Sequence, residues 1–164
     1  MATRQPKLRL DVGGGIYPKE GFINVDLFVE GAVKAPAWQL PYANGTVDEL
    51  NCSHVLEHIE KRMVIPTLRE FHRVLRAGTG LLTIEVPDLV WCCENWLAHQ
   101  DDDWNLDALF GNQDPPGGQF HLTGFNHMIL EKDLRAGGFT GSIARWEPFS
   151  HNQRCIHMEV FKDA

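Results

Sequence analysis

The sequence has no run of about 18 consecutive apolar residues, which is the length that a membrane-spanning helix needs. Its first ten residues carry Arg4, Lys7 and Arg9 but no apolar stretch of signal-peptide length. We therefore expect a cytoplasmic protein with no membrane partner. Internal repeats and low-complexity tracts are also missing, so we expect residues 1–164 to form a single domain.

The sequence also has few cysteines and no excess of positive charge. The four cysteines include an adjacent pair and no C-x-x-C, so neither a zinc knuckle nor a disulfide framework is indicated. We expect Cys52 and Cys155, in predicted strands, to be small buried hydrophobic residues. With 15 basic and 22 acidic residues the net charge is −7, which would repel a polyanion. Nucleic acid is therefore disfavoured as a partner.

Three consecutive glycines follow an apolar segment near the start of the chain. Residues 8–12 read as a buried strand that leads directly into Gly13, Gly14 and Gly15. Because glycine has no Cβ, such a loop lets a ligand approach the backbone closely. Residues 22–26 read as a second strand ending on Asp26, whose carboxylate can accept hydrogen bonds from both hydroxyls of a ribose. This pattern is typical of the start of a nucleotide-binding α/β sheet.

The connection between these two strands is too short for a full crossover helix. Only residues 16–21 separate Gly15 from Phe22, whereas a helical crossover takes about a dozen residues. We expect the first helix to be missing or reduced to one turn. A pyrophosphate seated on a helix N-terminus is then disfavoured, and with it a hydride-transferring dinucleotide enzyme.

The rest of the chain alternates between strand and helix patterns, which predicts an α/β fold with a mostly parallel sheet. Seven strands are expected, the last two as a C-terminal antiparallel hairpin: residues 8–12, 22–26, 31–34, 47–54, 81–86, 139–146 and 155–161. Helices are expected at residues 64–75 and 127–136, with one or two more within 89–110. Asp114-Pro115-Pro116-Gly117-Gly118 is expected to form a loop or lid.

Taken in order, these segments resemble the motifs of a short class I S-adenosylmethionine (SAM)-dependent methyltransferase of the methyltransferase type 11 kind. The resemblance covers about residues 8 to 90. It is carried by Leu10-Asp11-Val12-Gly13-Gly14-Gly15, Ile23-Asn24-Val25-Asp26-Leu27, Leu40-Pro41-Tyr42, Ser53-His54-Val55-Leu56-Glu57-His58, Phe71-His72-Arg73-Val74-Leu75-Arg76-Ala77-Gly78 and Val86-Pro87-Asp88-Leu89. It implies a Rossmann-like sheet, methyl transfer, SAM as cofactor and S-adenosylhomocysteine as its product.

The resemblance also implies roles for particular residues. The methionine part of the cofactor would lie over Asp11, Gly13, Gly14 and Gly15, and the ribose would bind Asp26. Ser53 and His54 would line the methyl group. The candidates to sandwich adenine are Leu27 and the loop formed by Trp38, Gln39 and Leu40.

Three histidines are candidates to act on the acceptor. Methyl transfer requires alignment of the two reactants, and a base with a pKa near 7 can assist removal of the acceptor's proton. His54, His58 and His121 stand at predicted edges of the cofactor cleft, and we predict that they are catalytic. The acceptor would be a small or carbohydrate-like molecule, contacted by residues 90 to 127. Trp91, Trp96, Trp104 and Phe110 there fit acceptor packing, the core or the interface of a homodimer.

Two other functions compete with methyl transfer. A non-catalytic SAM-binding module is favoured by the short first crossover, and by the absence near Ala35 of an acid that family members often carry. His54, Glu57 and His58 also satisfy H-x-x-E-H, the pattern of an inverted zinc protease, in which both histidines lie within one helix. Because this segment follows a predicted strand, we expect no metal here, and a zinc hydrolase is the weaker alternative.

Overall fold

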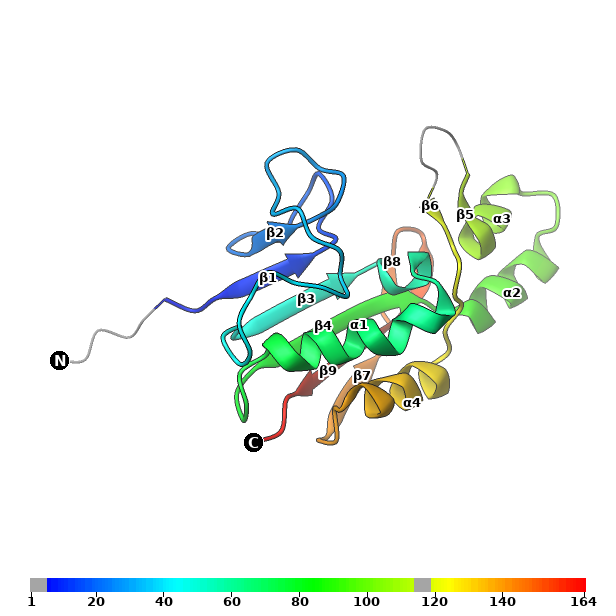
Figure 1. Ribbon diagram of the computed structural model, residues 1–164. Coiled ribbons are helices and arrows are strands. Elements are labelled where there is room, and N and C mark those ends of the chain that lie inside the picture. Colours follow the sequence, from blue (N-terminus) through cyan, green and yellow to red (C-terminus); the bar gives the residue numbers. More distant parts are fainter. Residues whose placement is uncertain (1–5, 114–118) are drawn as a thin grey trace.

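A seven-stranded sheet forms the centre of the computed structural model, which describes residues 6–113 and 119–164 (Figure 1). The loop or lid predicted at Asp114–Gly118 lies outside the described residues. The strands of the sheet are β1 (Arg9–Val12), β2 (Ile23–Val25), β3 (Glu49–Ser53), β4 (Leu81–Pro87), β7 (Ile143–Trp146), β8 (Phe149–Ser150) and β9 (Gln153–Phe161). Their order is β2-β1-β3-β4-β9-β7, with β8 paired to β9. The first four are mutually parallel, and β9 runs antiparallel to β4, β7 and β8.

The register of the sheet separates an apolar face from a polar one. Leu10, Leu50, Leu82 and Val160 are partners across four neighbouring strands, and each is at most 1% exposed. The row beside them is polar and consists of Asp11, Asn51, Thr83 and Glu159. Successive side chains of a strand point to opposite faces, so these rows lie on opposite sides of the sheet.

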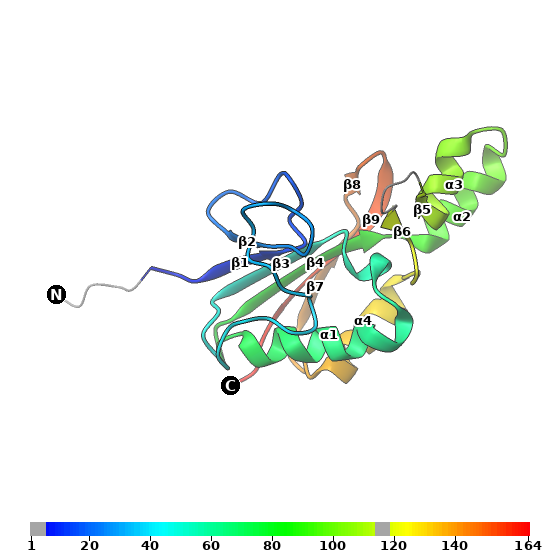
Figure 2. The ribbon, with the colours of Figure 1, turned by 45° about the horizontal axis from the view of Figure 1, so that its top comes forward.

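The helices cover the apolar face. Both α1 (Lys61–Val74) and α4 (His127–Gly137) lie on this side in the two views (Figures 1 and 2). The helices α2 (Leu89–Ala98) and α3 (Asp103–Phe110) continue beyond the carboxyl end of β4, and the short strands β5 (Gly111–Asn112) and β6 (Gln119–Phe120) pair beside α3. A single 3-10 turn, η1 (Leu56–His58), connects β3 to α1. None of the described helices is long and apolar enough to cross a membrane.

Within the part of the chain that the structure describes, the polar face has no helical layer, because the connections that would cover it contain no helix. Right-handed crossovers place their helices on opposite faces when the chain moves in opposite directions along a sheet. The chain moves one way from β1 to β2, and the other way from β3 to β4. Residues 13–22, which join β1 to β2, form turns, and so does most of the connection from β2 to β3. The prediction of a missing first helix is confirmed.

The strand predicted at residues 31–34 is wrong. In that segment Val33 alone pairs, in a single bridge with Val25. Gly31 stands before it at φ +81, and Pro36 follows without a backbone N–H, so a longer ladder cannot form there. The seventh strand is instead the two-residue β8 in the C-terminal hairpin.

The other predicted elements are confirmed with changes at their ends, and the largest change is in β7, which begins at Ile143 and not at residue 139. The helix expected at 64–75 is α1, which begins three residues earlier, and the expected helices of residues 89–110 are α2 and α3. Asn126 caps α4 by accepting a hydrogen bond from Ile129 N, and Gly138 ends that helix in the left-handed conformation at φ +111. The C-terminal antiparallel hairpin is formed by β7, β8 and β9.

Candidate functional site

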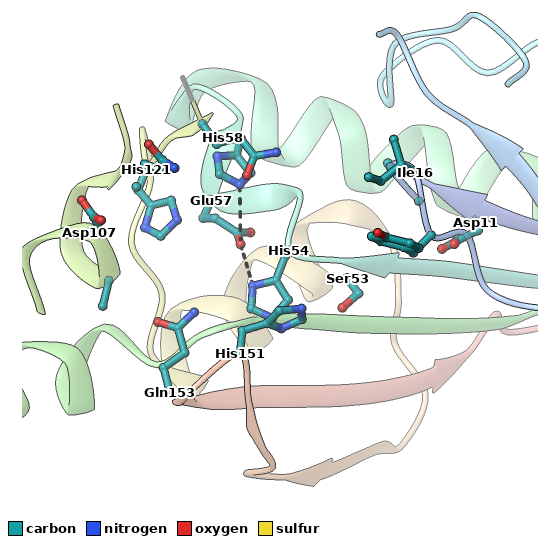
Figure 3. Close-up of a pocket in the computed structure, with 18 of the residues that line it drawn as sticks. Asp11, Ile16, Ser53, His54, Glu57, His58, Asp107, His121, His151 and Gln153 are labelled. Carbon is teal, nitrogen blue, oxygen red and sulfur yellow. Dashed lines mark ion pairs between the residues drawn. The ribbon is translucent and has the colours of Figure 1, made fainter. Parts of the chain in front are cut away.

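A cavity of about 790 Å³ opens at the carboxyl ends of β1 and β3. This is the edge at which open α/β sheets bind ligands, because the loops that leave parallel strands gather there. The walls come from the glycine loop, the segment from Ser53 to His58, the α3–β6 region and the β8–β9 turn (Figure 3). Of the predicted site residues, the lining includes Asp11, Gly13, Gly14, Gly15, Ser53, His54, His58 and His121.

The three glycines of the loop differ in the space around them. A Cβ on Gly13 would lie 2.3 Å from Val55 Cγ2, and a Cβ on Gly14 would lie 2.5 Å from a carboxylate oxygen of Asp11. Gly15 differs, because its φ is +60 and a Cβ there would meet nothing within 4 Å. Gly13 and Gly14 thus permit close packing beneath the loop, while Gly15 borders the open space of the cavity.

Asp11 holds this loop in place from below. Its carboxylate is 4% exposed and accepts hydrogen bonds from Lys19 N at 2.7 Å and from Asn51 Nδ2 at 2.7 Å. Asn24 Nδ2 donates to the Gly15 carbonyl at 2.9 Å. Sequence reasoning did not find Asn24 and Asn51 as supports of the loop, because only the register of β1 with its two neighbours brings them beside Asp11.

Asp26 lies at the end of β2 and contacts the same loop. One oxygen accepts a hydrogen bond from Gly15 N at 3.2 Å, and the other accepts from Phe28 N at 2.7 Å and Val29 N at 3.1 Å. Asp26 is not among the described residues that line the cavity. In this conformation its carboxylate organises the loop, and its role toward a ribose stays a prediction.

The predicted adenine candidates lie in different environments. Leu27 and Trp38 are exposed, at 45% and 41%, whereas Leu40 is 4% exposed and belongs to the core. Leu40 N donates to Glu70 Oε1 at 2.7 Å, so the backbone of this loop is tied to α1. Gln39 is exposed beside them. The surface-exposed Leu27 and Trp38 can contact a planar ring, while the side chain of Leu40 supports the loop from inside.

At the other end of the cavity the carboxylate of Glu57 lies between the rings of His54 and His58 (Figure 3). Oε1 is 3.2 Å from His54 Nδ1 and 4.0 Å from His58 Nε2. Glu57 is 2% exposed, yet neither of its carboxylate oxygens accepts a hydrogen bond of good geometry from the described residues. A buried carboxylate without such partners is energetically costly, so this group requires an explanation.

His54 is surrounded by acceptor groups. Besides Glu57, its Nε2 lies 3.5 Å from Glu85 Oε1 and 3.6 Å from Cys155 Sγ. Burial disfavours a charged ring, but the contacts with Cys155, Glu57 and Glu85 outweigh it and raise the pKa of His54 to about 11. The hydrogen bonds from His157 and His54 hold the pKa of Glu85 well below its usual range. His54 thus keeps its proton at neutral pH.

His58 and His121 face each other across the cavity wall, with ring centroids 5.1 Å apart. His58 Nδ1 lies 3.0 Å from the Phe120 carbonyl oxygen, which leaves Nε2 on the side of Glu57. Burial lowers the pKa of His121 below its ordinary value, although the Glu57 carboxylate opposes this shift. The Glu57 carbonyl accepts hydrogen bonds from Leu122 N and Thr123 N, which hold this segment against η1.

The geometry does not match a zinc protease. His54 follows the end of β3 at φ +54, and His58 ends a single 3-10 turn, so the two histidines do not lie on one face of an α-helix. The cavity wall also contains residues that the sequence did not indicate. They are Asp107 from α3, Gln119 from β6, and His151 and Gln153 from the C-terminal hairpin, whereas Trp104, a predicted candidate for acceptor packing, also lines the cavity. No local pattern marks them, because they reach the cavity only through packing of distant elements.

Comparison with known proteins agrees with this arrangement. Residues 18–83 match the family model described as a methyltransferase domain. A structure from Burkholderia thailandensis, 1,6-didemethyltoxoflavin-N1-methyltransferase with bound 1,6-didemethyltoxoflavin and S-adenosylhomocysteine, superposes with a TM-score of 0.64 at 20% identity over 97% of this chain and 72% of that chain. No curated protein matches the chain.

Two further structures show the same fold. A SAM-dependent methyltransferase from Thermotoga maritima, described as a possible histamine N-methyltransferase, has a TM-score of 0.66 at 14% identity and covers 95% of this chain and 82% of its own. A methyltransferase from Haloferax volcanii in complex with the Trm112 activator has a TM-score of 0.63 at 11% identity, covering 100% of this chain and 85% of its own.

The predicted fold and the predicted resemblance are therefore confirmed, and the glycine loop at the edge of the cavity fits the SAM cofactor. Residues 18–83 are thus similar to a methyltransferase domain, and the chain has the fold of SAM-dependent methyltransferase structures.

Proposed function

We propose that the chain transfers a methyl group from SAM to a small or carbohydrate-like molecule held in the cavity. The observation that supports this most is that the glycine loop and the pair His58 and His121 line one cavity of about 790 Å³. The cavity is large enough for part of a cofactor together with a small acceptor. SAM supplies, when bound, an electrophilic methyl group on a sulfonium.

The residues of this chain would then bind and orient the two reactants. Gly13, Gly14 and Gly15 would receive the amino acid part of the cofactor, with Asp11 and Asn51 fixing the loop. Asp26 would bind the ribose hydroxyls through the lone pairs that its backbone contacts leave free. Ser53 would lie near the transferred methyl group, and Leu27, Trp38 and Gln39 would contact adenine, with Leu40 supporting their loop.

His58 and His121, and not His54, would act on the acceptor. Both ring nitrogens of His54 are already engaged, by Glu57 on one side and by Glu85 and Cys155 on the other. We assign His54 a positioning role, in which it orients Glu57.

The acceptor is proposed to be neutral or cationic rather than a nucleic acid. The net charge is −7, and the carboxylates of Glu57 and Asp107 lie on the acceptor side of the cavity.

We further infer that the chain is one domain, in keeping with a core cluster that extends from Leu10 to Val160. The cytoplasm is its proposed location, since all four cysteines are free thiols. We propose that a homodimer contact forms at Phe110 and Leu97, two apolar side chains that are 54% and 62% exposed.

Calorimetry with SAM and with S-adenosylhomocysteine tests the cofactor half of this proposal. We expect saturable binding of both, weakened at least tenfold in Asp26→Ala. Asp101→Ala, which removes an exposed aspartate between α2 and α3, is the matched control and should bind normally. Normal binding by Asp26→Ala would show that the ribose lies elsewhere, and no binding of either ligand to the wild type would refute the proposal.

Turnover separates an enzyme from a non-catalytic SAM-binding module. His58→Ala and His121→Ala should each lower turnover at least tenfold and leave S-adenosylhomocysteine binding nearly intact, because both residues lie at the far end of the cavity from the glycine loop. His99→Ala, at an exposed histidine after α2, is the control. Cofactor binding without turnover across a panel of acceptors would favour the module.

A further inference from the structure

Three potential metal ligands meet in the wall of the cavity. Glu57, His58 and His121 each offer one ligand atom, and these atoms all lie within 4.8 Å of one another. Two imidazoles and one carboxylate form a set that binds zinc and other first-row divalent cations. The group includes His121, which lies far along the chain and reaches η1 only because residues 119–123 pack against it.

The carboxylate of Glu57 is the second observation that points to a cation. It is 2% exposed, its two oxygens have no hydrogen-bond partner among the described residues, and it lines the cavity. His54 approaches Oε1 from one side only. The side of the Glu57 carboxylate that faces His58 and His121 therefore carries negative charge next to the cavity.

The orientation of His58 supports the same conclusion. Its Nδ1 lies 3.0 Å from the Phe120 carbonyl oxygen, a position in which Nδ1–H donates to that oxygen. Nε2 is then the ring nitrogen on the side of Glu57, 4.0 Å from its Oε1. Metal-binding histidines commonly donate their other N–H to a backbone carbonyl in this way.

We propose that Glu57, His58 and His121 form a binding site for one divalent cation of the zinc type, with an open coordination position toward the cavity. Ligand atoms of a tetrahedral zinc site lie about 3.4 Å apart for bonds of about 2.1 Å. The ligand atoms of Glu57, His58 and His121 now lie up to 4.8 Å apart. Side-chain rotations that move these atoms by about an ångström would bring them to the zinc-site separation. The open position would take water or an oxygen of a molecule in the cavity. This assignment departs from the expectation of no metal and does not rest on methyl transfer.

A second group of potential ligands, His54, Glu85 and Cys155, is less suited to a cation. Glu85 already accepts hydrogen bonds from Ser150 Oγ at 2.8 Å and has His157 Nδ1 at 3.2 Å. Its negative charge is thus balanced by groups of the chain. Glu57 has only His54 Nδ1, 3.2 Å from Oε1, as a charged neighbour within that distance, and its Oε2 has no hydrogen-bond donor among the described residues, which is why the site is assigned to Glu57.

Metal titration of the purified, chelator-treated full chain tests the proposal. We expect one equivalent of Zn²⁺ by calorimetry, and one equivalent of Co²⁺ with the visible absorption bands of a low-symmetry site. Glu57→Gln and His121→Ala should each weaken Zn²⁺ binding at least tenfold. His99→Ala removes an exposed histidine outside the cluster and should leave binding unchanged.

The two variants test the metal site independently of each other. Glu57→Gln preserves the shape of the side chain, and if it fails to fold, His121→Ala alone decides. No saturable Zn²⁺ binding to the wild type, or binding that survives in the folded variants, would overturn the assignment. Calorimetry with S-adenosylhomocysteine on the same samples is independent: its failure would count against the proposed function and leave a measured metal site standing.

Discussion

Replacement of Gly15 by alanine tests whether the glycine loop borders the cofactor. Gly15 has φ +60, and a Cβ there would meet nothing within 4 Å. The left-handed conformation costs an alanine about 1–2 kcal/mol, so the free energy of unfolding should fall by that amount. For a chain of this size the melting temperature should fall by roughly 2–8 °C.

The added methyl group should also intrude on a bound ligand. Gly15 lines the cavity, so its Cβ would compete for the space that the amino acid part of the cofactor needs. An overpacked contact costs about 1–3 kcal/mol, which corresponds to an affinity for S-adenosylhomocysteine lowered by roughly five- to 150-fold. Calorimetry measures this affinity, and urea unfolding measures the stability.

Gly31 offers a matched control. Its φ is +81, a Cβ there would also meet nothing within 4 Å, and it does not line the cavity. Gly31→Ala should therefore lose about the same 1–2 kcal/mol of stability and bind S-adenosylhomocysteine normally. If Gly15→Ala were destabilised like Gly31→Ala and yet bound the ligand with unchanged affinity, the loop would not border the cofactor and the reasoning would be refuted.

Three further predictions concern stability. Arg73 donates hydrogen bonds to both carboxylate oxygens of Glu70 and lowers the pKa of Glu70. The stability that this pair contributes is complete above the unfolded pKa of about 4.3 and is lost as the pH falls through the folded pKa. Urea unfolding should therefore show that Glu70→Gln loses less stability than the wild type between pH 7 and pH 3, and equal losses would contradict the pairing. Phe71→Ala should cost about 3–5 kcal/mol because the ring is fully buried in the core, and a cost below about 1 kcal/mol by the same measurement would show that the site collapses. Asn126→Ala should cost about 1 kcal/mol by removing the bond from Ile129 N that caps α4, and thermal unfolding without a shift would argue against the cap.

The cavity histidines illustrate how far residue patterns reach. The sequence indicated His54, His58 and His121 together, because all three stand at predicted edges of the cofactor cleft, and all three do line the cavity. It did not distinguish among them. His54 is engaged on both ring nitrogens by Glu57, Glu85 and Cys155, and two of these come from other strands. The difference in environment thus arises from contacts that no local spacing encodes.

The strand predicted at residues 31–34 is a case in which the sequence predicted an element that the structure does not form. A short strand is predicted there, but pairing needs several consecutive backbone groups that are free to form hydrogen bonds. Gly31 and Pro36 restrict the backbone around Val33, and a single bridge remains. Two-residue strands such as β8 escape prediction for a related reason, since too few residues are involved to form a periodic pattern.

By itself the sequence determined the α/β class, the helix-free first crossover and the glycine loop ending at the sheet edge. These features depend on strand alternation, on helical spacing and on the conformations open to glycine, all of which are local properties of the chain. Only the tertiary structure decided that the face bearing Asp11 and Asn51 lacks a helical layer, and that Glu57 and His121 meet in one cavity wall. Those outcomes depend on strand order, crossover hand and the packing of residues 119–123 against η1, which join parts of the chain that are far apart in sequence.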